Sequence, residues 1–349
     1  MGWRRDTFEA FVGFNGLFAV QASELPRSPE RVFVLRNNDI GDLLVVTPLF
    51  DALKRTFPDA AIITGIGSWN RDVLLGNPHV SQVLTVNAPW HNKFVRPQGV
   101  VSALRYIYQS DEVNAIATSC ADIGIDVLGS GFGSLLMMRA GIPFRMGVRG
   151  YAGGEAGTQC SVEYRNEEHV GRQALRFAEM LGCVDLPENR PQLFLDKVPE
   201  IGRTIVIAPG TGLPEKGWPE AYFVELGRLL KDFKLIVIGS KAEVRLASLM
   251  RDGNPGIVDL TGKLSLRESF AIIGAARLLI SNASMAMHAA AAFHRPAVVL
   301  LGMQFTSAVA HHRQWGYPEA VHLGRERDHP TIFSPDEAIT QIREILSQL

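Results

Sequence analysis

The stretch VFVLRNNDIGDLL, residues 32–44, decides the fold class. It opens with an apolar run of mostly β-branched and aromatic residues at 32–35, which predicts a short buried strand. The polar turn RNNDIG at residues 36–41 follows, and the apolar residues of a predicted helix come next. A strand that passes through a short turn into a helix is the repeating unit of a parallel α/β sheet.

The same alternation continues along the chain and restarts once. Strands are predicted at residues 32–35, 61–66, 82–86 and 115–118, and again at 204–208, 235–239, 257–260, 278–280 and 297–301. Helices are predicted at 219–231, 242–251 and 266–275, from 284 onward, and at 335–349. A proline-rich, polar stretch at 187–199 separates the two series. Two consecutive α/β series of similar size predict two Rossmann-like domains facing a cleft, with ligands outside the carboxyl ends of the strands.

These boundaries define four parts of the chain. We expect an N-terminal extension at residues 1–30, an N-terminal Rossmann-like domain at 31–190, a C-terminal Rossmann-like domain at 200–330 and a last helix at 335–349. The length of 349 residues supports this division, because it exceeds what one hydrophobic core usually holds.

Composition excludes several classes of protein. With 35 basic and 36 acidic residues, the chain lacks the basic excess of a nucleic-acid-binding protein. Its three cysteines are far apart and have no metal-ligand spacing, which is typical of free thiols in a reducing compartment. No stretch is long and apolar enough to span a bilayer. We therefore expect a cytoplasmic protein.

The segment before the first strand allows three interpretations. Its apolar stretch, residues 8–20, follows two arginines, but Asp6 and Glu9 stand where a secretory signal avoids acids. The other interpretations are a helix packed on the body or on a partner, and a helix lying on a membrane surface, peripheral at the inner membrane. The residues expected on one face of this helix are Phe8, Phe11, Val12 and Phe18.

The first loop with chemical potential ends at Asp42. This aspartate stands at or near the start of the helix that follows the first strand. One interpretation is a helix cap, which stabilises by about 0.5–2 kcal/mol. The other is a general base at the carboxyl end of the strand. The GxGxxG pattern of a nicotinamide dinucleotide site is absent here.

Three loops of the second series are candidates for a phosphate or nucleotide site. APGTGLPEKGWP at residues 208–219 puts Lys216 in a small-residue turn, either as a phosphate contact or as a solvated lysine. In GSKAE at 239–243, Glu243 either completes a capping box with Ser240 or binds a ribose. In SNASMAMH at 281–288, backbone amides start a helix and form an anion site, while His288 is either a structural histidine or a ligand contact.

Taken together, these segments resemble glycosyltransferase family 9, the lipopolysaccharide heptosyltransferase family. The resemblance covers roughly residues 31–303. It rests on VFVLRNNDIGDLLVVTPLFDALKRTFPDA, GNPHVSQVL, AGIPFRMGVRG and EEHVGRQALRFAEMLG in the first half. In the second half it rests on APGTGLPEKGWPEAYFVELGRLL and DLTGKLSLRESFAIIGAARLLISNASMAMHAAAAFHRPAVVLLG.

The resemblance implies a GT-B fold and inverting, metal-independent transfer with no cofactor, typically from ADP-heptose. The first Rossmann-like domain would bind the acceptor and carry the catalytic base, and the second would bind the nucleotide sugar. Asp42 matches the family's catalytic base. On the donor side, Thr211 and Lys216 match phosphate contacts, Glu243 the ribose contact, Leu264 the base contact, and Ser284 and His288 the family's Asp-Thr-Gly-x-x-His element.

That last element departs from the family pattern. Ala283 stands in place of the aspartate, Ser284 in place of the threonine and Met285 in place of the glycine. The usual Gly-Pro-Thr after the next strand is replaced by GMQ at residues 302–304. These changes bear on the identity of the donor and on activity.

Three functions follow as hypotheses. The first is transfer of a sugar onto a cell-envelope glycolipid or glycan, with Arg105, Arg145 and Arg149 as cations for a phosphorylated acceptor. The second is a nucleotide-sugar-binding or interaction protein of the same fold that has lost transfer. The third is an enzyme such as an epimerase, which acts on a nucleotide sugar without an acceptor, and the Asp42 turn disfavours it.

Overall fold

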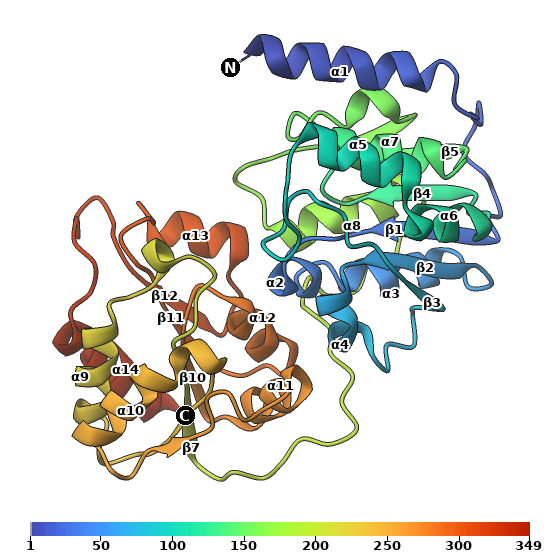
Figure 1. The fold of residues 1–349 in the computed structure, drawn as a ribbon. Coiled ribbons are helices and arrows are strands. Elements are labelled where there is room, and N and C mark those ends of the chain that lie inside the picture. The colour runs from blue at the N-terminus through green and yellow to red at the C-terminus, as the bar shows by residue number, and fades with distance from the viewer. Residues whose placement is uncertain (1) are drawn as a thin grey trace. The chain divides into compact units, whose positions relative to one another are not determined.

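The computed structural model describes residues 2–349, with side chains from residue 7 onward. The chain forms two compact units, unit 1 at residues 1–189 and unit 2 at residues 190–349 (Figure 1). Each unit contains one six-stranded sheet in which every pairing is parallel. The α/β fold class predicted from the sequence is confirmed.

The elements of unit 1 alternate as expected for a doubly wound sheet. Its strands are β1 (Arg31–Leu35), β2 (Ala61–Ile66), β3 (Gln82–Thr85), β4 (Ile123–Asp126), β5 (Phe144–Arg149) and β6 (Cys160–Glu163). Its α-helices are α1 (Gly2–Gly16), α2 (Ile40–Leu44), α3 (Pro48–Thr56), α4 (Arg71–Leu74), α5 (Val100–Gln109), α6 (Asp111–Thr118), α7 (Gly131–Arg139) and α8 (Val170–Met180). Two short 3₁₀ helices are η1 (Ser68–Asn70) and η2 (Glu155–Gly157).

Unit 2 repeats this arrangement. Its strands are β7 (Thr204–Ala208), β8 (Lys234–Val237), β9 (Val258–Asp259), β10 (Leu278–Asn282), β11 (Ala297–Leu300) and β12 (Ala320–Leu323). Its α-helices are α9 (Glu220–Leu229), α10 (Val244–Gly253), α11 (Leu266–Ala275), α12 (Met285–Ala292), α13 (Ala308–Trp315) and α14 (Pro335–Gln348). The 3₁₀ helices are η3 (Pro214–Lys216) and η4 (Lys241–Glu243).

Strand order is the same in both sheets. Unit 1 has the order β3-β2-β1-β4-β5-β6, and unit 2 has β12-β11-β10-β7-β8-β9, which is the same order viewed from the other edge. The chain direction across the sheet reverses between β1 and β4, and between β7 and β10. Ligands in open α/β sheets bind beside such a switch point, at the carboxyl ends of the strands. The loops after β1, β7 and β10 lie there.

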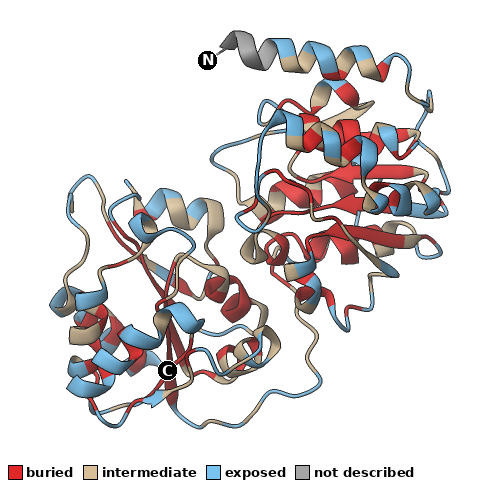
Figure 2. Cartoon of the chain, in the orientation of Figure 1, coloured by how far each residue is buried: buried red, intermediate tan, exposed pale blue. Residues whose placement is uncertain are grey.

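The central strands are buried because helices cover both faces of each sheet (Figure 2). Every residue of β7, β10 and β11 is buried, which is why apolar residues predominate in these strands. The last helix, α14, belongs to unit 2, since Ala338, Ile339, Ile342 and Leu346 pack into its core.

One predicted strand is wrong. Residues 115–118 lie in α6, and the fourth strand is β4. Val113 and Ile116 are the buried residues of α6, three apart as on a helix, and Ser110 caps the helix by accepting from the Glu112 amide. The residues expected to form one helix after Asp42 form two, because Pro48 begins α3 at its first turn.

The N-terminal extension is part of unit 1. Val12 on α1 is fully buried, and Phe8 lies against Phe132 of α7 with ring centroids 4.9 Å apart. Phe11 and Phe18, in contrast, are 40% and 77% exposed. The prediction that these four residues share one face is therefore wrong, since α1 ends before Phe18 and buries only part of the set. Within the described residues, no helix combines the length and apolar character needed to cross a membrane.

Candidate active site

Asp42 lies in the first turn of α2, directly beyond the carboxyl end of β1. Its Oδ2 accepts a hydrogen bond from the Asp39 amide at 3.2 Å, so the capping interpretation describes a real contact. Its Oδ1 lies 3.4 Å from Nη2 of Arg36, whose side chain is 5% exposed. The Asp42 side chain itself is 33% exposed. The Asp42 carboxylate thus contacts the Asp39 amide and the Arg36 guanidinium, and part of it is still exposed to solvent.

Arg36 is a site residue that the sequence interpretation missed. Its Nε donates to the main-chain carbonyl of Asp42 at 3.1 Å, so one guanidinium binds both the backbone and the side chain of that residue. An adjacent cation favours the ionised form of a carboxylate. Its position at the end of the first strand was visible in the sequence, but nothing there indicated which carboxylate it would meet.

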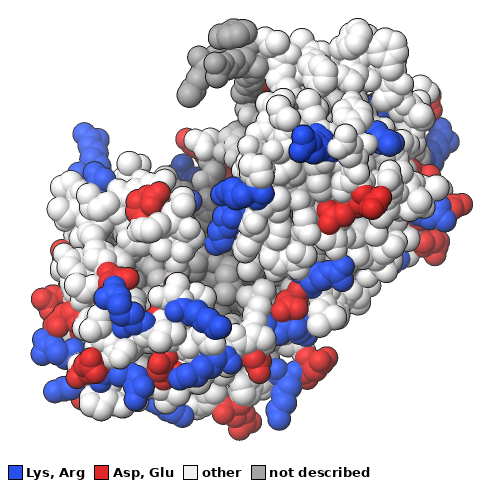
Figure 3. All heavy atoms as spheres, viewed as in Figure 1, with Lys and Arg blue, Asp and Glu red and all other residues white. Residues whose placement is uncertain are grey.

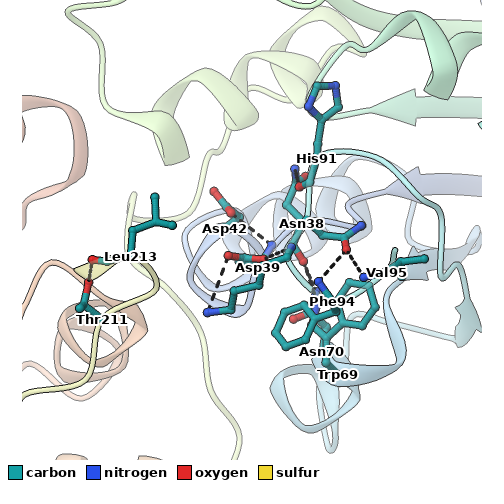
Figure 4. A network of polar contacts seen from close by, with 12 residues as sticks. Asn38, Asp39, Asp42, Trp69, Asn70, His91, Phe94, Val95, Thr211 and Leu213 are labelled. Atoms are coloured by element: carbon teal, nitrogen blue, oxygen red, sulfur yellow. Dashed lines mark hydrogen bonds and ion pairs between the residues drawn. The ribbon is translucent and has the colours of Figure 1, made fainter. Parts of the chain in front are cut away.

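A polar network supports the turn before Asp42 (Figure 4). The main-chain carbonyl of Asn38 accepts hydrogen bonds from Trp69 Nε1 and Asn70 Nδ2, both at 2.9 Å. Asn38 Nδ2 donates to the carbonyl of His91 at 2.8 Å. These contacts tie the turn to η1 and to the loop after β3, and so fix the backbone that presents Asp42.

The loop after β3 places aromatic and basic groups beside this turn. Phe94 stacks on Trp69 with centroids 4.4 Å apart, and the Lys93 amide donates to Asp39 Oδ1 at 3.3 Å. His91 has a left-handed backbone, with φ of 54°, and its imidazole points away from the network in Figure 4. Burial and the Arg36 charge lower the pKa of His91, which favours its neutral form.

The three arginines predicted to bind the acceptor have different surroundings. Arg105 on α5 and Arg149 at the end of β5 are exposed. Arg145 is 1% exposed and donates to the carbonyls of Gly157, Val20 and Ile142 at 2.7–2.9 Å. The acceptor assignment of Arg145 is a correction: its guanidinium is committed to backbone carbonyls inside unit 1.

In unit 2, the loop that carries Lys216 is clamped from two sides. The buried side chain of Asn282, at the end of β10, donates to the Pro209 carbonyl at 2.5 Å and accepts from the Trp218 amide at 2.9 Å. The Gly302 amide donates to the Lys216 carbonyl at 3.2 Å. A Cβ at Gly302 would lie 2.2 Å from the Gly217 carbonyl oxygen, so only glycine allows this approach. Nothing in the sequence around Asn282 indicates this role.

The Lys216 ammonium forms no ion pair with the carboxylates described in this structure. Thr211, in the same loop, donates its hydroxyl to the Leu213 carbonyl at 3.1 Å, which leaves its oxygen lone pairs to accept (Figure 4). The loop therefore presents a cation on a backbone that is held in place.

Glu243 forms the capping box with Ser240, as one interpretation of the sequence expected. Its Oε2 accepts from the Ser240 amide at 2.7 Å and from the Ser240 hydroxyl at 2.8 Å. Its carboxylate also lies 3.4–3.5 Å from the Cβ position of Gly210, which brings the loops after β7 and β8 together. Leu264, between β9 and α11, is half-buried.

Ser284 caps α12, and its hydroxyl accepts from the Ala286 amide at 3.4 Å. His288, one turn further on, is 4% exposed, and its Nδ1 lies 2.7 Å from the Tyr317 hydroxyl. This burial and the Tyr317 contact fit the structural interpretation, and the donor contact of His288 stays a prediction.

Histidines gather behind the Lys216 loop. His311 Nδ1 lies 2.8 Å from His322 Nδ1, and the His312 ring meets that of His322 edge to face. Burial lowers the pKa of His322 to about 2. Burial, with the charges of His312 and Lys216, lowers the pKa of His311 to about 4. Among the residues with described side chains, no three histidine, cysteine or acidic groups are placed to hold a metal ion.

Comparison with known proteins agrees with this arrangement. The sequence model described as glycosyltransferase family 9 (heptosyltransferase) matches residues 114–314, more than half of the chain. The chain belongs to glycosyltransferase family 9. It is therefore a glycosyltransferase, as predicted from the resemblance.

Individual members of the family are distant from this chain. Lipopolysaccharide heptosyltransferase 2 of Escherichia coli is 24% identical, over 80% of this chain and 86% of that protein. The solved family 9 glycosyl transferase of Veillonella parvula has a TM-score of 0.75 at 18% identity, covering 94% of this chain and all of that one. An E. coli heptosyltransferase solved with ADP-2-deoxy-2-fluoro heptose has a TM-score of 0.71 at 16% identity, over 90% of this chain and 99% of that one. The structural likeness shows the shared GT-B fold.

Proposed function

We propose that this family 9 enzyme transfers heptose from ADP-heptose, with inversion, onto a hydroxyl of a membrane glycolipid of the lipopolysaccharide core type. The observation that carries the proposal is Asp42, a surface-reaching carboxylate at the switch point of unit 1 that buried Arg36 holds by ion pair. The names of its relatives support the choice of substrate. One is a lipopolysaccharide heptosyltransferase, and another was solved with an ADP-heptose analogue.

Asp42 is the proposed general base. Its carboxylate accepts the proton of the acceptor hydroxyl while that oxygen attacks the anomeric carbon of the donor. The bond between this carbon and the diphosphate oxygen breaks, and ADP leaves with the electron pair. A positioned base of this kind contributes roughly 10²–10⁴-fold to the rate.

Unit 2 supplies the donor contacts in this proposal. Lys216 neutralises the charge that develops on the leaving diphosphate, and groups already in place for such charge contribute strongly to catalysis. The Thr211 and Ser284 hydroxyls and the first amides of α12 bind phosphate oxygens. Glu243 binds the ribose through Oε1, since the capping box uses Oε2. Leu264 contacts the nucleotide base.

Arg105 and Arg149 are the cations that we retain for an acidic or phosphorylated acceptor, because both are exposed. In this proposal no metal or cofactor takes part, and the reaction occurs on the cytoplasmic side of the inner membrane, where a nucleotide sugar and a lipid-linked acceptor meet.

A second candidate is a protein of the same fold that binds nucleotide sugars without transfer. Ala283 and Met285 favour it, since they replace the acidic residue and the glycine that the family carries at this helix start. In this candidate, the half-buried Met285 at the first position of α12 hinders the approach of a phosphate to the helix amides.

The test is binding followed by turnover. A panel of ADP-, UDP- and GDP-sugars is titrated calorimetrically, and the sugars that bind are incubated with glycolipid extracted from cell envelopes. The Asp42→Asn variant serves as the matched control. Transfer from ADP-heptose that depends on Asp42 supports the proposal. Binding without transfer to any extract supports the second candidate, and transfer only from another nucleotide sugar overturns the donor assignment.

A further inference from the structure

Unit 1 carries an apolar surface on the outer side of α1 and the turn that follows it. We call it the N-terminal apolar surface. Its members are Phe11, Phe14, Leu17, Phe18 and Val20, with exposed fractions of 40%, 60%, 75%, 77% and 63%. With roughly 150–250 Å² for each aromatic side chain, these fractions amount to on the order of 500 Å² of exposed apolar area. The largest apolar patch on a folded monomer has about this area, roughly 300–600 Å², and is often an interaction site.

This surface is held on the body of unit 1. The opposite side of α1 buries Val12, and a Cβ at Gly131 of α7 would lie 2.4 Å from the Phe8 ring. Beyond the helix, the buried Arg145 donates to the carbonyl of Val20 at 2.8 Å. The Ala22 amide bonds to the Pro143 carbonyl at 3.0 Å. Both ends of the segment are anchored, so the exposure of the phenylalanines is a property of the folded unit.

The charges around the surface are arranged asymmetrically. The carboxylate of Glu9 lies over Gly153, 3.1 Å from its Cβ position, and Glu155 has one oxygen buried and the other bonded to the Gly150 amide. Both acids therefore turn toward the protein. Arg139 and Arg149, by contrast, are exposed. Arg139 follows Met138, whose methyl group lies 3.7 Å from the Cβ position of Gly16.

In Figure 3, the described part of α1 shows no charged side chain on the visible face. An apolar face together with basic residues is typical of a helix that lies in the interface of an anionic bilayer. The sequence adds Arg4 and Arg5 before the apolar stretch.

We propose that the N-terminal apolar surface docks unit 1 on an anionic lipid bilayer, the membrane that carries the acceptor. This inference rests on the proposed function for the choice of a lipid partner. Phe14, Leu17 and Phe18 enter the level of the lipid headgroups, while Arg139 meets anionic headgroups. Docking then confines the search for a lipid-linked hydroxyl to the membrane plane.

The experiment is co-sedimentation of the full chain with vesicles, without donor or acceptor. Vesicles of phosphatidylethanolamine and phosphatidylglycerol are compared with vesicles of phosphatidylcholine alone. The test variant is Phe14→Glu with Phe18→Glu, which changes exposed side chains only. The matched control is Val101→Glu, at a residue of α5 that is 74% exposed. We expect the test variant to lower vesicle binding by about tenfold or more, and the control to bind like wild type.

Binding that prefers the anionic vesicles and is lost in the test variant alone supports the proposal. Equal binding by wild type and test variant overturns it. A second copy of the chain is the competing occupant, and light scattering tests for it. If wild type is a dimer, the test variant is a monomer and neither binds vesicles, then a second copy covers this surface. That outcome overturns the membrane assignment.

Transfer rates with two kinds of acceptor distinguish a failure of the docking proposal from a failure of the proposed function. With a deacylated, water-soluble acceptor, the test variant should transfer at the wild-type rate, while its transfer to vesicle-embedded acceptor falls. Vesicle binding could also follow the expected pattern while the protein transfers no sugar from any nucleotide sugar. That outcome supports the docking surface and refutes only the proposed function.

Discussion

Arg36 and Asp42 form an ion pair at 3.4 Å in which the cation is buried and the carboxylate reaches the surface. The same guanidinium also bonds to the backbone carbonyl of Asp42. A helix cap alone would need neither contact. The arrangement restricts the orientation of the carboxylate at the carboxyl end of β1, which is what a general base requires.

Replacing Asp42 should therefore separate catalysis from binding. Asp42→Asn keeps the size of the side chain and an oxygen that can accept from the Asp39 amide, but removes the base. We expect turnover to fall by about 10²-fold or more, with donor affinity measured by calorimetry nearly unchanged. Asp39→Asn is the control, since it changes a neighbouring carboxylate of the same turn. Transfer at the wild-type rate by Asp42→Asn would show that this residue is only a cap.

Lys216 should act on the donor. Its ammonium is held on a loop clamped by Asn282 and Gly302, and a charge-assisted contact to the diphosphate contributes roughly 1.5–3 kcal/mol. Lys216→Ala should weaken ADP-sugar binding by about tenfold or more. Lys231→Ala, at an exposed lysine after α9, should leave it unchanged. Equal affinities in both variants would return Lys216 to the interpretation of a solvated lysine.

Transfer should not need a divalent metal. The resemblance to a metal-independent family implies this, and Lys216 with the amides of α12 can supply the positive charge that a metal would otherwise bring. Initial rates in excess chelator should equal those in buffer with magnesium. A rate that falls in chelator and returns with added manganese or magnesium would refute the expectation.

The histidine pair of unit 2 should make stability depend on pH. Burial lowers the pKa of His311 to about 4 and that of His322 to about 2, whereas the usual pKa of a histidine is near 6.5. Between pH 6.5 and pH 4, both histidines therefore stay mostly neutral in the folded chain. The unfolded chain binds more protons there, so the free energy of unfolding should fall as pH drops from 6.5 to 4. The loss is on the order of 3 kcal/mol for one such histidine.

Unfolding by urea at pH 6.5 and pH 4.5, followed by tryptophan fluorescence, measures this dependence. His311→Gln with His322→Gln should flatten it. His329→Gln is the control, because hydrogen bonding to Glu337 raises the pKa of His329 and gives a contribution of opposite sign. If the free energy of unfolding of the double variant depends on pH as strongly as that of wild type, other groups cause the loss of stability at low pH.

The fold was predictable where a strand is apolar throughout. The runs at β1, β2 and β7 were recognised because both faces of these strands are buried. β5 lacks such an apolar run, because arginines are its second and last residues. Arg145 is buried there and donates to the backbone carbonyls of Ile142, Gly157 and Val20, of which the last lies 125 residues away in sequence. Nothing in the local sequence signals that contact.

The candidate site was predictable at the level of loops. Turns after strands pointed to Asp42, Lys216 and Glu243, because parallel strands present their carboxyl ends along one edge. The partners of these residues were not predictable. Arg36 contacts Asp42 because the turn between them brings the two side chains together. Asn282 contacts the Lys216 loop from a different strand, β10. The burial of His288 was not predictable either, and it fits the structural one of the two interpretations that the sequence left open.

Residues 283–285 allow the sharpest test of the donor site. Here the chain has Ala283 and Met285 where the family has aspartate and glycine, while Ser284 keeps a hydroxyl at the start of α12. If the chain is a working transferase, Ser284 and the helix amides still hold the phosphates, and Met285 shapes a donor pocket unlike that of other family members. The variant Ala283→Asp with Met285→Gly restores the family residues. In a helix interior the glycine would cost about 0.5–1 kcal/mol of stability, and Met285 is the first residue of α12, where the cost is smaller. Thermal unfolding must still be measured beside activity.

The double variant gives a different result for each hypothesis. If Met285 alters donor choice, wild type turns over some nucleotide sugar and the variant shifts the preference, measured as the ratio of kcat/KM for two donors. If transfer has been lost, wild type turns over none and the variant gains binding or activity. If wild type is fully active with ADP-heptose and the variant leaves kcat/KM unchanged, both hypotheses are wrong. These two positions would then tolerate substitution because Ser284 and the backbone amides suffice to hold the diphosphate.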